Sequence, residues 1–458
     1  MGLLRKSAAG FLLLGLIVVA PLRGTEFSFL NQNARAAGLG GAFVARADNV
    51  FALAYNPAGI AFLSGLRFET GCLINHRLIT VSAPSSGLSI TSNPFQFWGS
   101  GALSWQPWSW VTLGLGFFTP YSARFNWPWT WPGKSFCVNM EIDAHYFRPT
   151  VAFRLPGNLA VGAGLDLVFS DLVWNHEMTL TLDKFPDLDT ILYDSRYEMS
   201  GRGLGFSAGI LWKAHRMLQV GAKYQHRVVI DYRGFDIFDS RTPAAPLIPH
   251  PTIPKFYYYE FFQFFFKRQE VTSRLTLPRE VAGGVLIAPF PNLSLTFDAQ
   301  WTAWHELGSW DFQSLNSDES LSPDFTPLYR EFYGIGPNYG FQSAGLVLKD
   351  AWSYKGGIEY DLFGRFAVRG GLARHESAAE THDLNPVYPD LERTVMSLGF
   401  GYEGPFYSIW DRKEMGQFLI DVFFQYSWAK RTTSSLLPVE LTYEGNRWVL
   451  GISVGFII

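Results

Sequence analysis

The chain of 458 residues has few charged residues for its size. Asp, Glu, Lys and Arg make up 17% of it, whereas hydrophobic residues make up 48% and aromatic residues 17%. An average soluble domain carries roughly 25% charged residues, which cover the surface that faces water. We therefore expect part of this protein's surface to face something other than water.

Long hydrophobic runs are also missing beyond the N-terminus. No later stretch approaches 18 uninterrupted apolar residues, and a membrane-spanning helix needs roughly 20. Membrane-spanning helices are therefore not expected. The chain is either a secreted soluble protein or a membrane protein that crosses the bilayer with strands.

Cysteine and known catalytic motifs are scarce or absent. Cys72 and Cys137 are the two cysteines, too few for a disulfide scaffold, and one bridge or two unpaired thiols are equally open. No Walker lysine loop, HExxH or GxSxG motif occurs, so we expect no catalytic residue, cofactor or metal. The net charge is −3 without a basic run, which argues against nucleic acid as a partner.

The N-terminus has the order of a secretory signal. Arg5 and Lys6 precede an apolar run from Ala8 to Pro21, and the small residue Gly24 follows. This run is shorter than a membrane-spanning helix requires. We predict that residues 1–24 are a signal peptide that is removed; the alternative is an uncleaved anchor helix.

Several segments alternate apolar and polar residues, as a barrel strand does when one face meets lipid. They are residues 218–230, 293–303, 418–428 and 448–458. The last segment runs to the chain end, as expected of a closing strand that leaves no sheet edge in the membrane. Residues 66–458 are predicted to form an all-β transmembrane antiparallel barrel. In the segment 218–230, His226 interrupts the apolar face. We predict that this face points to lipid and that it consists of Leu218, Val220, Ala222, Tyr224, Val228 and Ile230.

Residues 25–65 lack this alternation. Residues 33–43 are rich in Ala and Gly, and the segment continues to an Asn-Pro-Ala-Gly sequence at residues 56–59. An Asn-Pro pair alone is a weak turn signal. We expect a separate, tightly packed N-terminal segment before the barrel.

In combination, these motifs resemble the FadL/TodX family of outer-membrane transporters for long-chain fatty acids and aromatic hydrocarbons. The resemblance covers nearly the whole mature chain. It implies a monomeric barrel of 14 strands whose lumen is closed by an N-terminal hatch that contains Asn56, Pro57 and Ala58. The number 14 comes from the resemblance, because alternation alone does not distinguish 12 from 16. The matching motifs are residues 38–43, 45–48, 56–59, 118–121, 148–152, 277–278, 354–360 and 369–373.

Two aromatic segments are candidates for binding a hydrophobic ligand, because such a ligand needs apolar surface on the extracellular loops. The first segment, residues 117–131, is similar to the family's third extracellular loop, which forms a capture groove; the alternative is an aromatic belt at the membrane interface. For the second segment, residues 256–266, three roles are equally open: a capture wall, an interfacial segment or a buried strand top. The candidate residues of the first segment are Phe118, Pro120, Tyr121, Phe125, Trp127, Trp129 and Trp131.

A carboxylate ligand favours a cationic partner inside an apolar pocket, since a buried charge must be paired. The candidates are Arg124, Lys134, Arg148 and Arg369. Each of them can instead be a wall residue or face lipid headgroups. A hydrocarbon ligand needs none of them, so the sequence leaves the substrate class open.

The expected function is passive uptake of hydrophobic molecules, such as fatty acids, hydrocarbons or detergent-like lipids, across the bacterial outer membrane. The resemblance implies a pocket above the hatch and a lateral exit through the barrel wall. Expected partners are outer-membrane lipid and the barrel assembly machinery, and the protein is expected to be a monomer. The alternatives are a general porin, an outer-membrane lipid hydrolase, for which no nucleophile motif is present, and an adhesive role of the loops.

Overall fold

The computed structural model describes most of the predicted barrel and the segment before it. The predicted signal peptide and the aromatic residues 256–266 lie outside the described residues. Within the described part, no helix has the length and hydropathy to cross a membrane. The described residues are 31–83, 87–180, 191–240, 268–308, 310–314, 341–344, 347–380, 384, 389–407, 414–434 and 440–458.

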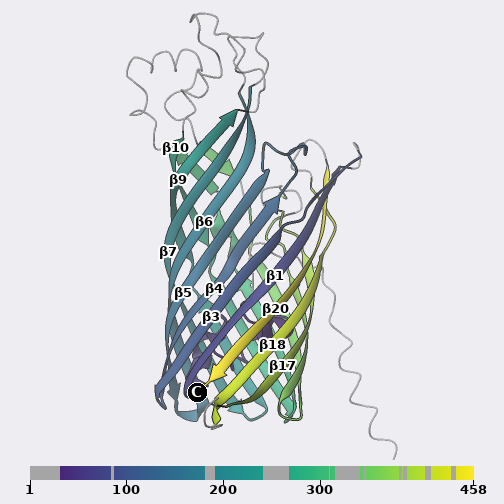
Figure 1. Ribbon diagram of the computed structural model, residues 1–458. Coiled ribbons are helices and arrows are strands. Elements are labelled where there is room, and N and C mark those ends of the chain that lie inside the picture. Colours follow the sequence, from purple (N-terminus) through teal and green to yellow (C-terminus); the bar gives the residue numbers. More distant parts are fainter. Residues whose placement is uncertain are drawn as a thin grey trace, which may run out of the picture.

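The strands form one antiparallel sheet that closes on itself (Figure 1). Strand β1 pairs with β20 along its length, with Arg67 opposite Ile457. The uninterrupted strands are β1 (Leu66–Ala83), β4 (Val111–Asn126), β5 (Asn139–Leu155), β6 (Leu159–Leu180), β7 (Ile191–His215), β16 (Phe366–His375), β17 (Arg393–Tyr407) and β20 (Leu441–Ile457).

Six further barrel strands each consist of two segments, so that the barrel has 14 strands, as the resemblance implies. Each pair of segments lies end to end between the same neighbours. The pairs are β2 (Leu88–Ser92) with β3 (Phe95–Trp108), β8 (Leu218–Gln225) with β9 (Val228–Ser240), β10 (Gln269–Leu277) with β11 (Glu280–Phe290), β12 (Leu293–Thr302) with β13 (Trp310–Ser314), β14 (Phe341–Ala344) with β15 (Ala351–Leu362), and β18 (Glu414–Ala429) with β19 (Thr432–Ser434).

The alternation predicted for β12, β18 and β20 is confirmed. In β12, Asp298 and Gln300 are buried inside the barrel, whereas Phe297 between them is exposed on the outside. In β20, Ser453 is buried and Leu450 and Ile452 are exposed. The lower barrel is therefore apolar towards lipid and polar towards the lumen, as a membrane barrel requires.

The strand predicted at residues 218–230 is interrupted at His226 and Arg227, and its alternation changes phase there. Gln225 faces inward below the interruption, and Val228 and Ile230 face inward above it. Our assignment of Val228 and Ile230 to the lipid face is therefore wrong. One extra residue at a bulge moves every later side chain to the opposite face of the sheet.

Two other strands change phase at a similar level. In β4, Phe118 and then Tyr121 face inward, three residues apart instead of two, and a register shift lies between them. Between β10 and β11, Leu277 and then Glu280 face inward with the same spacing. On this wall the upper interior is apolar and the upper exterior polar, as in a soluble protein. The change of phase therefore marks the extracellular edge of the membrane-facing surface.

The described residues before β1 fold into short helices. Helix α1 (Ala34–Gly38) begins at Asn33, whose side chain accepts hydrogen bonds from the N–H groups of Arg35 and Ala36, a favourable N-terminal cap. Gly40 follows with φ of 68°, the left-handed conformation that commonly ends a helix. The chain continues through α2 (Ala52–Tyr55) and the 3-10 helix η1 (Pro57–Phe62).

This N-terminal segment lies in the lumen, because it bonds to strands on opposite sides of the barrel. The N–H groups of Phe43 and Val44 both donate to Asp298 of β12 (2.6 and 2.8 Å). Asn33 donates to Ser453 of β20 (3.2 Å). Small residues permit this packing, since a Cβ added to Gly371 of β16 would lie 2.1 Å from the backbone nitrogen of Gly40.

Candidate functional site

Asn56 joins three parts of the structure. The fully buried side chain donates to the carbonyl groups of Val44 (2.8 Å) and of Ile210 in β7 (3.0 Å). Its Oδ1 accepts a hydrogen bond from the N–H of Ala58 (3.2 Å), while Pro57 begins η1. None of these three motif residues lines the two cavities described below. Their contacts therefore fix the N-terminal segment to the barrel wall.

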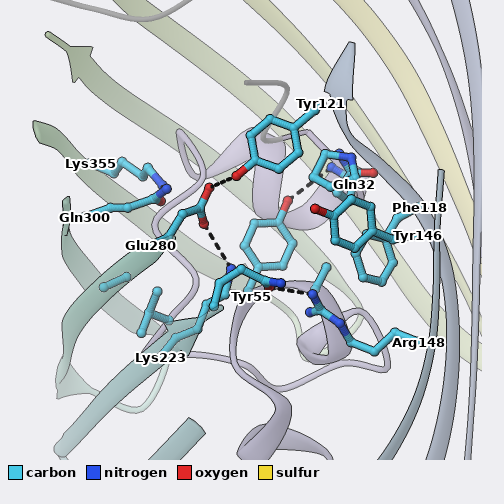
Figure 2. Close-up of a pocket in the computed structure, with 15 residues that line it drawn as sticks. Gln32, Tyr55, Phe118, Tyr121, Tyr146, Arg148, Lys223, Glu280, Gln300 and Lys355 are labelled. Atoms are coloured by element: carbon cyan, nitrogen blue, oxygen red, sulfur yellow. Dashed lines mark hydrogen bonds and ion pairs between the residues drawn. The ribbon is translucent and has the colours of Figure 1, made fainter. Parts of the chain in front are cut away.

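A small cavity of about 40 Å³ lies between the N-terminal segment and the barrel wall (Figure 2). Aromatic rings and charged groups line it together. Tyr55 closes the cavity from the N-terminal segment; its hydroxyl accepts a hydrogen bond from the N–H of Gln32 (3.2 Å), and burial raises its pKa. The lining residues are Gln32, Val44, Ala54, Tyr55, Phe118, Pro120, Tyr121, Tyr146, Arg148, Lys223, Gln225, Glu280, Ala282, Gln300 and Lys355.

Of the charged groups in this cavity, Glu280 and Lys223 form an ion pair, whereas Lys355 forms none with any described residue. Glu280 accepts hydrogen bonds from the hydroxyl of Tyr121 (2.8 Å) and from Nζ of Lys223 (3.2 Å), as Figure 2 shows. Lys355 is 6% exposed, and its Nζ donates to the neutral Oε1 of Gln300 (2.7 Å). No carboxylate among the described residues lies within ion-pair distance of Lys355. Asp298 and Glu280 act on the charge of Lys355 from a greater distance. Because no carboxylate of the described residues contacts Nζ directly, this ammonium can still donate a hydrogen bond to an anion.

Sequence reasoning missed Lys355 and chose four other cations, each of which has a carboxylate partner. Arg148 lines the cavity but pairs with Asp166 and also donates to the carbonyl of Leu53 (2.7 Å). The other three do not line the cavity. Their ion pairs are Arg124 with Glu141, Lys134 with Glu177, and Arg369 with both Glu359 and Asp421.

The aromatic candidates of the first segment are divided between a strand and a loop. Phe118, Tyr121 and Phe125 belong to β4, which corrects their prediction as loop residues, and Trp127 is the first residue after the strand. The alternative of an aromatic belt at the membrane interface does not hold for these side chains or for Trp131, because they are buried in the interior. Pro120 and Trp129 are half-buried.

These buried aromatic residues belong to one hydrophobic cluster in the upper barrel. The rings of Trp127 and Trp131 stack with centroids 5.1 Å apart, and Nε1 of Trp131 donates to the carbonyl of Cys137 (2.8 Å). Cys137 and the outward-facing Cys72 are both unpaired thiols. The cluster gives the upper interior an apolar lining that leads towards the cavity.

The wall between β3 and β4 has incomplete backbone pairing. The strands pair from Gly101 opposite Phe117 down to Trp108 opposite Val111, and β4 then bulges at Thr119 and Pro120. The side chain of Gln32 takes the place of a neighbouring strand there. Its Nε2 donates to the carbonyl of Thr119 (2.9 Å), and its Oε1 accepts from the N–H of Thr119 (3.0 Å). The N-terminal segment therefore covers a gap in the wall.

A second cavity, of about 140 Å³, lies near the ends of the chain's first and last barrel strands. Charged and other polar residues make up most of its lining. Arg35 crosses between Asp48 and Glu359, with N···O distances of 3.1 Å to each. This charged surface binds water and ions better than an apolar molecule. Its lining includes Arg35, Asp48, Arg67, Glu69, Glu403 and Asp421.

A closed antiparallel barrel with an apolar outer surface and a polar lower lumen is the architecture of an outer-membrane protein. The model of the family described as outer membrane protein transport protein (OMPP1/FadL/TodX) matches residues 26–455. The chain belongs to this family, whose members are outer-membrane transporters of hydrophobic compounds, and the protein is located in the bacterial outer membrane.

Relatives share the fold at low sequence identity. Outer membrane protein P1 of Haemophilus influenzae is 20% identical over 415 residues, which cover 80% of each chain. A Pseudomonas aeruginosa FadL homologue has a TM-score of 0.77 at 16% identity, covering 94% of this chain and 99% of that one. The Pseudomonas putida toluene transporter TodX has a TM-score of 0.66 at 14% identity, covering 93% and 98%.

Proposed function

We propose that the protein takes up hydrophobic molecules with an anionic headgroup, of which long-chain fatty acids are the simplest. The observation that carries this proposal is Lys355, a buried ammonium whose hydrogen-bond partner among the described residues is the neutral Gln300 (2.7 Å). A fatty-acid carboxylate would pair with it, while the chain would lie against Phe118, Tyr121 and Tyr146. Burial of the chain contributes roughly 0.8 kcal/mol per CH₂ group.

The entry route is the apolar upper interior. The inward-facing residues of β4 and β9 above the phase change include Phe125, Ile230 and Tyr232, so an alkyl chain would meet hydrophobic side chains from the loops down to the cavity. Transport needs no energy source, because the ligand moves down its own gradient. We propose that residues 25–65 act as a hatch that closes the lower lumen.

The cavity of about 40 Å³ holds a few water molecules, far less than the volume of a long alkyl chain. This conformation is therefore closed, and a ligand must displace part of the N-terminal segment. Gln32 and Tyr55 line the cavity, and Gln32 also covers the gap between β3 and β4. We propose that a ligand entering the cavity releases Gln32 and uncovers this gap.

Lateral exit through the gap is favoured over exit through the lower lumen. An apolar ligand moving straight down would meet the charged second cavity, with Arg35, Asp48 and Glu69 in its lining. Moving sideways between β3 and β4, it would reach the lipid-facing surface instead. The downward route costs more free energy than the sideways route, because an apolar ligand there would displace water from charged groups.

The test is uptake of oleate and of toluene by cells that lack their own transporter. The Lys355→Gln variant is expected to lower oleate uptake at least about tenfold, the equivalent of one charge-assisted hydrogen bond, whereas Lys355→Arg keeps it. Lys430→Gln, which removes an exposed lysine of the upper barrel, is the matched control.

Three other outcomes would replace this proposal. Toluene uptake without oleate uptake would favour a hydrocarbon channel, the activity named for TodX and compatible with the aromatic lining of the cavity. Uptake of small polar solutes alone would indicate a general porin. Ester hydrolysis by the purified protein would indicate a lipid hydrolase. We propose a monomeric transporter without enzymatic activity.

A further inference from the structure

The outer face of β7, β9 and β10 carries exposed arginines above its apolar surface. Arg202 of β7 lies opposite Asp231 of β9, and Asp231 lies opposite Arg274 of β10. Figure 1 shows that these strands extend beyond β17 and β18 at the upper end of the barrel. We call the following five residues the arginine patch: Arg202, Arg227, Arg233, Arg274 and Arg279.

The arginine patch lies at the extracellular edge of the membrane-facing surface. Immediately below it, the rings of Phe206 and His226 stack at 4.7 Å, and the hydroxyl of Tyr224 lies 2.9 Å from Nδ1 of His226. Aromatic residues of this kind are enriched at the membrane interface. Leu204, 63% exposed, is the next outward residue of β7 below Arg202. The guanidinium groups are therefore at the level of the lipid headgroups.

Three arginines of the arginine patch lie within ion-pair distance of a described carboxylate, and two do not. Asp231 accepts from Nε of Arg274 (2.7 Å). Glu306 accepts from Nε of Arg279 (2.7 Å) and lies 4.0 Å from Arg227. Asp171 of β6, opposite Ser200 in β7, is a third carboxylate. Further up the same face, Glu198 pairs with Arg196 (2.5 Å) and Glu270 lies two residues from Arg268. Within the arginine patch, Arg202 and Arg233 have no ion pair with any described residue.

We propose that the arginine patch binds the phosphate groups of lipopolysaccharide in the outer leaflet. A guanidinium group donates two parallel hydrogen bonds to a phosphate, and neighbouring strands are about 4.8 Å apart, so arginines of two strands reach one headgroup. Thr272 lies opposite Arg233 and provides a hydroxyl donor at the same level. The outer face of β7, β9 and β10 is thus a lipid-binding surface separate from the transport route.

The experiment compares binding of phosphorylated and dephosphorylated lipid A to the purified full-length protein in detergent, measured by native mass spectrometry. The variant is Arg202→Gln/Arg233→Gln/Arg274→Gln. The matched control, Arg216→Gln/Arg365→Gln, removes two exposed arginines from the short turns at the other end of the barrel. Heat-modifiable migration on gels verifies that each barrel is folded, and single substitutions replace the triple variant if it does not fold.

The triple variant is expected to bind phosphorylated lipid A at least about tenfold more weakly than the unmodified protein, since each arginine near a charged lipid surface contributes about fivefold. The control variant keeps its affinity, and dephosphorylated lipid A binds both proteins equally. Unchanged binding of phosphorylated lipid A by the triple variant would overturn the proposal. Competition by millimolar inorganic phosphate would also overturn it, because the surface would then bind a free anion.

Discussion

At the scale of single residues, buried polar side chains hold the N-terminal segment inside the barrel. Asn56 satisfies two backbone carbonyl groups, one of the segment and one of β7. Asp298 accepts from two consecutive backbone N–H groups of the segment. Because water does not reach these groups, each lost partner leaves an unsatisfied buried atom, which costs about 1–3 kcal/mol.

Replacing Asn56 by Ala is therefore expected to loosen the segment. The carbonyl groups of Val44 and Ile210 lose their donor, and local opening of residues 44–58 should become easier by about 2–4 kcal/mol. Hydrogen exchange measured by mass spectrometry reports this as faster exchange of these residues. Asn292→Ala serves as control, because Asn292 lies in the short turn just before β12. Equal exchange rates of residues 44–58 in both variants would contradict the anchoring role of Asn56.

The close approach of Gly371 to Gly40 gives a second prediction. Gly371→Ala places a Cβ 2.1 Å from the backbone nitrogen of Gly40, whereas Gly370→Ala places one 3.4 Å from a methyl group of Ile358. The first change should displace the segment and raise the single-channel ion conductance in planar bilayers. The second, in the same strand, should leave the conductance unchanged. Equal conductance of both variants would show that the contact does not hold the segment.

At the scale of elements, one-residue bulges decide what each strand presents to the lumen. The alternation in β12, β18 and β20 is continuous, and the sequence was sufficient to assign their faces. In β4, β8/β9 and β10/β11 a single extra residue exchanges the faces. A pattern of period two does not reveal such an insertion when apolar residues stand on both sides of it, as Val228 and Ile230 do after Tyr224.

The bulge in β4 also creates the backbone groups that Gln32 satisfies. Gln32→Ala would leave the N–H and carbonyl of Thr119 without these partners, so amide exchange at Thr119 is expected to accelerate by at least about tenfold. Exchange is measured on the purified protein in detergent. Gln106→Ala is the control, because Gln106 bonds to Ala61 and Thr112 away from the bulge. Slow exchange at Thr119 in Gln32→Ala would mean that another group closes the gap.

At the scale of the whole molecule, barrel closure brings together the residues of the cavity. More than 50 positions separate Lys223 from Glu280, and Glu280 from Lys355. Taken one at a time, the sequences of their strands predict ordinary barrel strands and give no sign of a shared cavity. The family motifs predicted the 14 strands, because these motifs span the chain. They did not predict which lumen-facing cation lacks a carboxylate, since that depends on the three-dimensional pairing of every other charge.

In the proposed mechanism, a hydrophobic ligand leaves the lumen sideways between β3 and β4. The most direct measurement is oleate uptake by Ser100→Cys/Thr119→Cys, in a protein with Cys72 and Cys137 replaced by Ser, after a short thiol cross-linker has joined the two strands across the gap. Both positions contact Gln32 in the closed conformation. Leu103→Cys/Leu115→Cys joins the same strands where they are already paired, at two outward-facing positions. We expect cross-linking to stop uptake by the first protein and to leave uptake by the second unchanged. Continued uptake with the gap joined would exclude lateral exit.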